Sequence, residues 1–154
     1  MDEKTLLEAV KNGELSVEQA LAALKRKPFE DLGYAKVDLH RRVRQGAAEV
    51  IYGAGKTPEQ IAGIARAMLE NGQETILITR LAPDAAAQVQ KSLPLRYFDT
   101  ARCGVLGSLP TPGGLGTIVI ATGGTSDLPV AEEAALTAQA LGNRVTRLYD
   151  VGVA

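Results

Sequence analysis

The residues of this sequence best suited to hold an anion form one glycine-rich turn. Gly123 and Gly124 permit a ligand to approach the backbone closely. Thr125 and Ser126 offer hydroxyls to a phosphate or a ribose, and Asp127 can accept from a sugar hydroxyl or cap a helix. An apolar run precedes the turn and a helical pattern follows it, so free backbone N–H groups and the helix dipole point at it. Two interpretations stay open: a substrate-binding loop, or a helix cap that binds no ligand.

A second turn, GAGKT at residues 53–57, resembles the end of a P-loop but lacks its first glycine. The P-loop pattern requires Gly five positions before Gly55, where this chain has Val50. Lys56 could meet an anion at the start of the next helix. The pattern favours a tight turn with Thr57 as the helix N-cap.

One Cys and one His offer little catalytic or metal chemistry. Cys103 and His40 lie far apart in the sequence and have no zinc-like ligand spacing, so no metal site is expected. Cys103 could be a nucleophile, but a lone Cys is more often a small buried apolar side chain. A single Cys excludes an intramolecular disulfide framework and fits a reducing compartment.

The most basic stretch surrounds the single histidine. His40 lies beside Arg41, Arg42 and Arg44. This cluster could bind an acidic ligand or another subunit, or it could be a solvated connector.

Composition points to an α/β protein. Of the 154 residues, 45% are hydrophobic but only 4% are aromatic and none is Trp, which favours a core of Ala, Val, Leu and Ile in helix-on-sheet layers. A net charge of −1 argues against a strongly basic nucleic-acid surface. No run approaches the roughly 18 apolar residues that span a membrane, so a soluble, cytoplasmic protein without membrane contact is expected.

The N-terminal part predicts a helical hairpin over residues 2–27. Helical spacing of apolar residues ends at Asn12, and Ser16 with Gln19 forms a capping box for the second helix. The hairpin could pack on the body of the protein or bind a partner. Residues 29–45 follow as a polar connector with an extended segment at 34–39.

From residue 47 to residue 106 the pattern predicts a small βαβαβ domain. Strands are expected at 50–52, 75–79 and 95–98, with helices from Pro58 to 71 and over 83–92 between them. Such alternation indicates parallel crossovers. Residues 107–116 are rich in Gly and Pro, as domain linkers are, and place a boundary near residue 113. The N-terminal domain therefore spans residues 1–113.

Residues 114–154 predict a new unit. The β-branched run at 117–121 is typical of a strand buried on both faces of a parallel sheet. A helix from Pro129 to about 141 and a strand at 144–151 complete one βαβ unit. Doubly wound domains need about 100 residues or more, so this unit is expected to be the truncated start of a longer domain.

Three segments carry a family resemblance. The stretches EVIYG at 49–53 with KTPEQ at 56–60, ATGGTSDLPVAEEA at 121–134, and LYDVGVA at 148–154 closely resemble LarB, the pyridinium-3,5-biscarboxylic acid mononucleotide synthase family. The second unit is also similar to PurE, the aminoimidazole ribonucleotide carboxylases, whose nucleotide loop reads Gly-Ser-x-Ser-Asp. Gly123, Ser126 and Asp127 match that loop, whereas Gly124 replaces its first Ser and removes one hydroxyl. The resemblance implies a flavodoxin-like three-layer fold for this part.

The resemblance also implies an activity for a complete protein. That activity is carboxylation of the pyridinium ring of nicotinic acid adenine dinucleotide, with release of AMP, in nickel-pincer nucleotide cofactor biosynthesis. It implies carbon dioxide or bicarbonate as co-substrate, Mg²⁺ as a candidate ion, no tightly bound cofactor, and a homo-oligomer. The family's cysteine nucleophile is expected beyond Ala154 and does not match Cys103, so the chain alone is expected to be inactive.

Two other functions compete with this one. The first is a non-catalytic interaction module that binds another chain through the helical hairpin. The second is a PurE-like nucleotide-binding protein of different chemistry.

Overall fold

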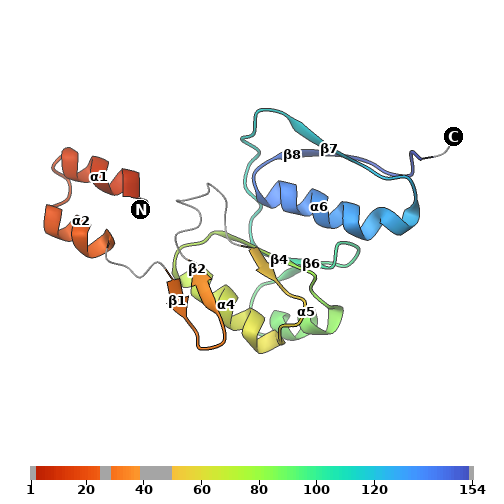
Figure 1. Cartoon of the computed structure of the whole chain (residues 1–154), viewed down its shortest axis with the longest axis horizontal. Coiled ribbons are helices and arrows are strands. Elements are labelled where there is room, and N and C mark those ends of the chain that lie inside the picture. Colours follow the sequence, from red (N-terminus) through yellow and green to blue (C-terminus); the bar gives the residue numbers. More distant parts are fainter. Residues whose placement is uncertain (1–2, 25–28, 39–49, 153–154) are drawn as a thin grey trace. The chain divides into compact units, whose positions relative to one another are not determined.

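The computed structural model describes residues 3–24, 29–38 and 50–152. The chain divides into two compact units, residues 1–47 and 48–154 (Figure 1).

The first unit begins with the predicted helical hairpin. Helices α1 (Glu3–Lys11) and α2 (Val17–Leu24) contact each other and bury Leu6, Ala9 and Ala20. The capping box is present, because the Ser16 N–H donates to Gln19 Oε1 at 2.9 Å and the Gln19 N–H donates to Ser16 Oγ at 3.1 Å. Residues 25–28, at the predicted end of the hairpin, lie outside the described residues.

The predicted polar connector contains a β-hairpin instead. Strands β1 (Phe29–Asp31) and β2 (Lys36–Asp38) pair antiparallel, so the expected extended segment is present but its partner strand was missed. The turn between them closes locally, since the Gly33 N–H donates to Asp31 Oδ1 at 2.9 Å. Strands of three residues are too short to produce a recognisable alternation of apolar and polar side chains.

The second unit opens with a four-stranded sheet of order β3-β4-β6-β5. Strands β3 (Val50–Tyr52) and β4 (Thr75–Thr79) are parallel and joined through α4 (Pro58–Glu70), as predicted. Helix α5 (Pro83–Gln90) leads to β5 (Arg96–Phe98), and β6 (Cys103–Gly107) follows.

The expectation of purely parallel pairing is wrong for this sheet. Strand β6 lies between β4 and β5 and runs antiparallel to both. The sequence concealed β6 because it contains two glycines and its last residue, Gly107, was assigned to the linker. Strands β4 and β5 run in the same direction but do not touch as neighbours in the sheet.

The C-terminal βαβ unit has the predicted order. Strand β7 (Thr117–Ala121) and strand β8 (Arg144–Leu148) pair in parallel, and a short 3-10 turn η1 (Thr125–Asp127) and helix α6 (Leu128–Ala140) connect them. Residues 108–116 contain neither helix nor strand. The boundary at residue 113 stays a prediction.

Strand β7 is not buried on both faces. Ile118 and Val119 are 39% and 55% exposed. Among the described residues this sheet has two strands, and α6 contacts both of them. A helix on one face leaves the other face of this sheet open to solvent, so this expectation is corrected.

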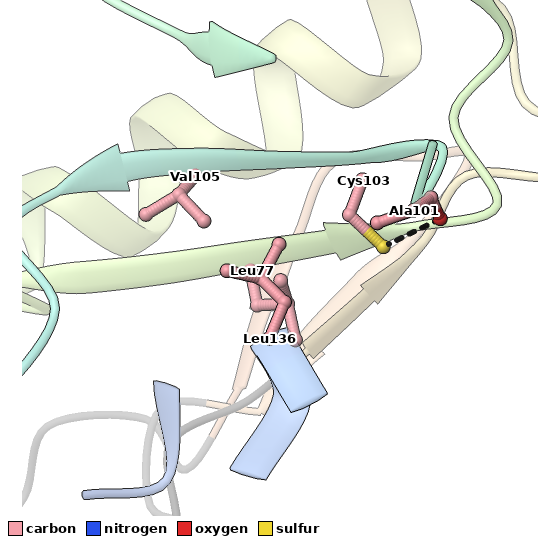
Figure 2. Packing of buried hydrophobic residues seen from close by; sticks show 5 residues of the cluster. All are labelled: Leu77, Ala101, Cys103, Val105 and Leu136. Carbon is pink, nitrogen blue, oxygen red and sulfur yellow. Dashed lines mark hydrogen bonds between the residues drawn. The ribbon is translucent and has the colours of Figure 1, made fainter. Parts of the chain in front are cut away.

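Helix α6 also packs on the first sheet. Leu136 joins a buried cluster with Leu77 of β4 and Val105 of β6, shown in Figure 2. Ile76 and Ile78 alternate with Leu77 and point to the opposite face, where they are fully buried. Helix α4 contacts β3 and β4 and lies on the other side of the sheet from α6 (Figure 1). The sheet is thus covered by helices on both faces, in a mixed α/β arrangement.

Candidate functional site

The candidate site lies where strands β7 and β8 end. The Thr122 N–H donates to the Leu148 carbonyl and the Val151 N–H donates to the Thr122 carbonyl, both at 3.0 Å. These bonds hold the loop after β7 against the loop after β8. The carboxyl edge of parallel strands is the usual ligand-binding edge in α/β folds.

The structure brings all five predicted site residues together on one turn. Gly123, Thr125, Ser126 and Asp127 are exposed, and Gly124 is half-buried. The turn leads directly into α6, whose dipole favours a negatively charged group at this end, although the Leu128 N–H donates to the Thr125 carbonyl and Pro129 has no N–H.

Asp127 stabilises the turn itself. Its Oδ2 accepts from the Gly124 N–H at 3.3 Å, whereas its side chain makes no capping bond to α6. The interpretation of Asp127 as a helix cap therefore applies to the short turn η1 and not to helix α6. Thr125 and Ser126 are exposed residues, so the substrate-loop interpretation keeps its two proposed donors.

A polar network anchors the end of β8 to α6. Glu132 of α6 accepts from Arg147 Nε at 3.1 Å and from the Tyr149 hydroxyl at 2.7 Å. Arg147 also donates to Gln139 Oε1 at 3.1 Å. Partial burial and then the bond to Glu132 raise the pKa of Tyr149. Tyr149 therefore stays protonated at neutral pH, and its hydroxyl donates a hydrogen bond to Glu132.

The turn at residues 53–57 is a helix start, as the pattern favoured. Thr57 and Gln60 form a complete capping box at α4, with the Gln60 N–H 3.3 Å from Thr57 Oγ1 and the Thr57 N–H 3.0 Å from Gln60 Oε1. Lys56 Nζ donates to the Tyr52 carbonyl at 2.8 Å. The ammonium group of Lys56 is thus used within its own turn.

Cys103 is a core residue. It is fully buried, and its Sγ donates to the Ala101 carbonyl at 3.2 Å (Figure 2). Burial, and secondly the negative charge of Glu133, raise the pKa of the thiol to about 11. The interpretation of Cys103 as a small buried apolar side chain is confirmed, since a thiol of this kind supplies almost no thiolate at neutral pH.

Other sequence candidates contribute less. His40, Arg41, Arg42 and Arg44 lie outside the described residues. Within the described ranges, no group of three or more His, Cys, Asp or Glu side chains could hold a metal ion. In the same ranges no helix is both long enough and apolar enough to cross a membrane.

Sequence reasoning missed a groove and three residues of the candidate site. The groove, of about 280 Å³, lies between α4 and α5 and is lined by Pro58, Glu59, Ala62, Arg66, Gln88, Val89, Lys91 and Ser92. The three residues are Thr122, Asp150 and Gly152, whose loops meet through hydrogen bonds and close backbone contact. A polar residue directly after the apolar run of β7 was the available signal for Thr122.

Comparison with known proteins identifies the family. The model of the LarB/PurE-like N-terminal domain matches residues 29–108, just over half of the chain. The chain belongs to this family. The LarB/PurE-like match covers β1 to β6 and ends before the turn at residues 123–127.

A relative is similar to this chain over nearly its whole length. MJ0165, an uncharacterized protein of Methanocaldococcus jannaschii, is 29% identical over an alignment of 158 positions that covers 98% of this chain. The chain spans 62% of the length of that relative. Membership confirms the resemblance to LarB; the PurE-like nature of residues 114–154 stays a prediction.

Proposed function

We propose that this chain provides the N-terminal domain and a nucleotide-binding turn of a LarB-like carboxylase acting on nicotinic acid adenine dinucleotide. The family match at residues 29–108 is the observation that carries the proposal. The exposed turn from Gly123 to Asp127, at the carboxyl end of β7 and the start of α6, supports it. Carbon dioxide or bicarbonate is the proposed co-substrate, and the cytoplasm the proposed location.

In this proposal the turn binds and orients the dinucleotide. The diphosphate accepts hydrogen bonds from the Thr125 and Ser126 hydroxyls, at the end of α6 whose dipole attracts negative charge. A ribose hydroxyl donates to Asp127. Such positioning can lower a reaction barrier by several kcal/mol without any bond-making group on the turn.

The chemical step needs a thiolate that this chain does not hold. A thiolate adds to the pyridinium ring, and the resulting enamine-like ring attacks carbon dioxide through carbon. Loss of the ring proton and of the thiolate then restores the aromatic ring, while water cleaves the phosphoanhydride and releases AMP. Cys103 is the single Cys of the chain, and it is buried with a pKa of about 11. We therefore expect binding without turnover.

Calorimetric titration with nicotinic acid adenine dinucleotide tests the binding step. Asp127→Ala should weaken binding at least about tenfold, because it removes an acceptor and loosens the turn. Asp84→Ala is the matched control, since Asp84 is also exposed and lies in the first turn of α5. A wild-type chain that does not bind the dinucleotide at millimolar concentration would refute the proposal. Similar affinity for many unrelated nucleotides would favour a PurE-like protein of other chemistry.

An assay of AMP release in bicarbonate tests whether this chain binds the dinucleotide without catalysing its reaction. The full-length M. jannaschii relative should release AMP from the dinucleotide, and this chain should release none. Turnover by this chain alone would show that its own residues complete the reaction, and the scaffold role would then be wrong.

The helical hairpin favours a second candidate function, a non-catalytic interaction module. Leu7, Val17 and Leu21 are 61%, 56% and 50% exposed on α1 and α2. Side chains of this size lose stabilising free energy when left in water, and another copy of the chain could cover them. Sedimentation velocity should then show a smaller assembly after deletion of residues 1–27, with dinucleotide affinity unchanged. An unchanged number of subunits in the assembly would exclude the hairpin as the oligomer contact.

A further inference from the structure

Thr122 is a buried polar side chain at the candidate site. It directly follows β7, immediately precedes the turn at Gly123, and is only 7% exposed. A buried hydroxyl without a hydrogen bond costs free energy, so the hydrogen-bond partner of Thr122 indicates why a polar side chain lies at this buried position.

That partner belongs to the other loop of the site. Thr122 Oγ1 accepts from the Asp150 N–H at 3.2 Å, 28 positions along the chain. Asp150 has a φ of +58°, a left-handed conformation that residues with a side chain rarely adopt. The neighbouring bond from the Val151 N–H to the Thr122 carbonyl holds the same turn from its other side. Thr122 therefore holds the turn at Asp150 through both its side chain and its backbone carbonyl.

The loops after β7 and β8 lie in close backbone contact at Gly152 and Gly123. A Cβ atom at Gly152 would lie 2.4 Å from Gly123 Cα and 2.6 Å from the Gly123 carbonyl oxygen. Such distances are shorter than real contacts, so only glycine fits at position 152 with the loops in this arrangement. Gly123 is the first residue of the proposed nucleotide-binding turn and receives this contact directly.

We infer that Thr122 is a positioning residue for the nucleotide-binding turn. By holding the left-handed turn at Asp150, its hydroxyl sets Gly152 against Gly123 and fixes the backbone at the start of the nucleotide-binding turn. The inference rests on the proposed function and deepens it, because it assigns the geometry of that site to the loop after β8.

Two substitutions at Thr122 separate positioning from packing. Thr122→Val keeps the shape of the side chain but removes the acceptor for the Asp150 N–H. It should weaken binding of nicotinic acid adenine dinucleotide about tenfold, the loss expected for one hydrogen bond with its dependent geometry. Thr122→Ser keeps the hydroxyl and loses a buried methyl group, so it should lower the melting temperature and bind the dinucleotide with nearly the wild-type affinity.

A substitution at Gly152 disturbs the same contact with Gly123 without changing the Thr122 hydroxyl. Gly152→Ala should displace the loop from Gly123 and weaken binding at least as much as Thr122→Val, even if the latter variant does not fold. Gly113→Ala is its control, because a Cβ there meets no atom within 4 Å.

The outcomes discriminate between the inference and the function beneath it. A wild-type chain that fails to bind the dinucleotide removes the proposed function. If the wild type binds and Thr122→Val or Gly152→Ala binds equally well, the proposed function stands and the positioning role is overturned. Equal losses of affinity and melting temperature in Thr122→Val and Thr122→Ser would also overturn it, since Thr122 would then act through packing alone.

Discussion

Burial decides what the most reactive single residue of this chain can do. Cys103 sits among Leu77, Val105 and Leu136, and its thiol has no contact with solvent. Desolvation disfavours the thiolate and is the largest cause of the rise in its pKa to about 11. A residue that sequence alone left open as a nucleophile therefore contributes to stability and not to chemistry.

The raised pKa of Cys103 predicts a pH-dependent stability. The unfolded thiol ionises near pH 9 and the folded one near pH 11, so its contribution is complete below pH 9 and is lost as the pH rises to 11. The free energy of unfolding should fall by roughly 3 kcal/mol over this range on account of this group. Urea unfolding of wild type and Cys103→Ala at pH 8 to 11, under reducing conditions, measures the difference. Identical pH slopes for the two proteins would contradict the prediction.

The capping box of α4 predicts a measurable local contribution. Thr57→Ala removes the acceptor for the Gln60 N–H and should lower the free energy of unfolding by about 1 kcal/mol. Thr57→Ser keeps an acceptor at the same position and should cost much less. Urea denaturation at neutral pH distinguishes them, and equal losses for both variants would assign the effect to the methyl group instead.

At the scale of elements, α6 packs on both sheets of the second unit. Ala135 and Leu136 are buried, and α6 contacts β4 of the first sheet as well as β7 and β8 of the second. Its adjacent acidic residues pair with different sheets: Glu132 with Arg147 of β8, and Glu133 with Arg80 at 2.7 Å, just after β4. The helix that begins at the candidate site is therefore fixed from both sides.

The shared packing of α6 predicts a large effect at Leu136. Leu136→Ala leaves a cavity against Leu77 and should destabilise the protein by about 2 to 4 kcal/mol. Val130→Ala on the same helix is the control, because Val130 is 63% exposed and should change stability by less than about 0.5 kcal/mol. Thermal and urea unfolding measure both. A Leu136 variant as stable as the Val130 variant would show that α6 does not pack on the first sheet in solution.

For the whole molecule, the division into units differs from the extent of the family match. The compact units meet between residues 47 and 48, whereas the LarB/PurE-like match begins at residue 29 and ends at residue 108. The second unit contains both sheets that α6 joins, together with the candidate turn. Its core is drawn from residues that all lie after residue 48.

This division predicts that residues 48–154 fold without the first unit. The fragment should unfold cooperatively, with a melting temperature within a few degrees of the whole chain, since its core cluster is complete. Residues 1–113 are the counterpart: they lack α6, expose Leu77 and Val105, and should bind a hydrophobic dye. Circular dichroism and dye fluorescence provide the readouts. A fragment 48–154 without a cooperative transition would show that the first unit is required for the fold.

Local physics made a good part of this protein predictable from its sequence. The capping boxes at Ser16 and Thr57 depend on residues three positions apart, and the strands at 50–52, 75–79 and 117–121 on short apolar runs. The five residues of the candidate turn were found for the same reason, because a turn between a strand and a helix is contiguous in the chain. Their role in substrate binding is still a prediction.

Only the tertiary structure decided how these pieces meet. The insertion of β6 between β4 and β5, the use of α6 by two sheets, and the open face of β7 depend on partners that no local pattern specifies. The bond between Thr122 and Asp150 likewise joins residues 28 positions apart, and it holds a residue whose φ is +58°. Local hydrogen bonds and periodicity involve residues that are close in the sequence, whereas burial and loop contacts depend on which distant segments pack together.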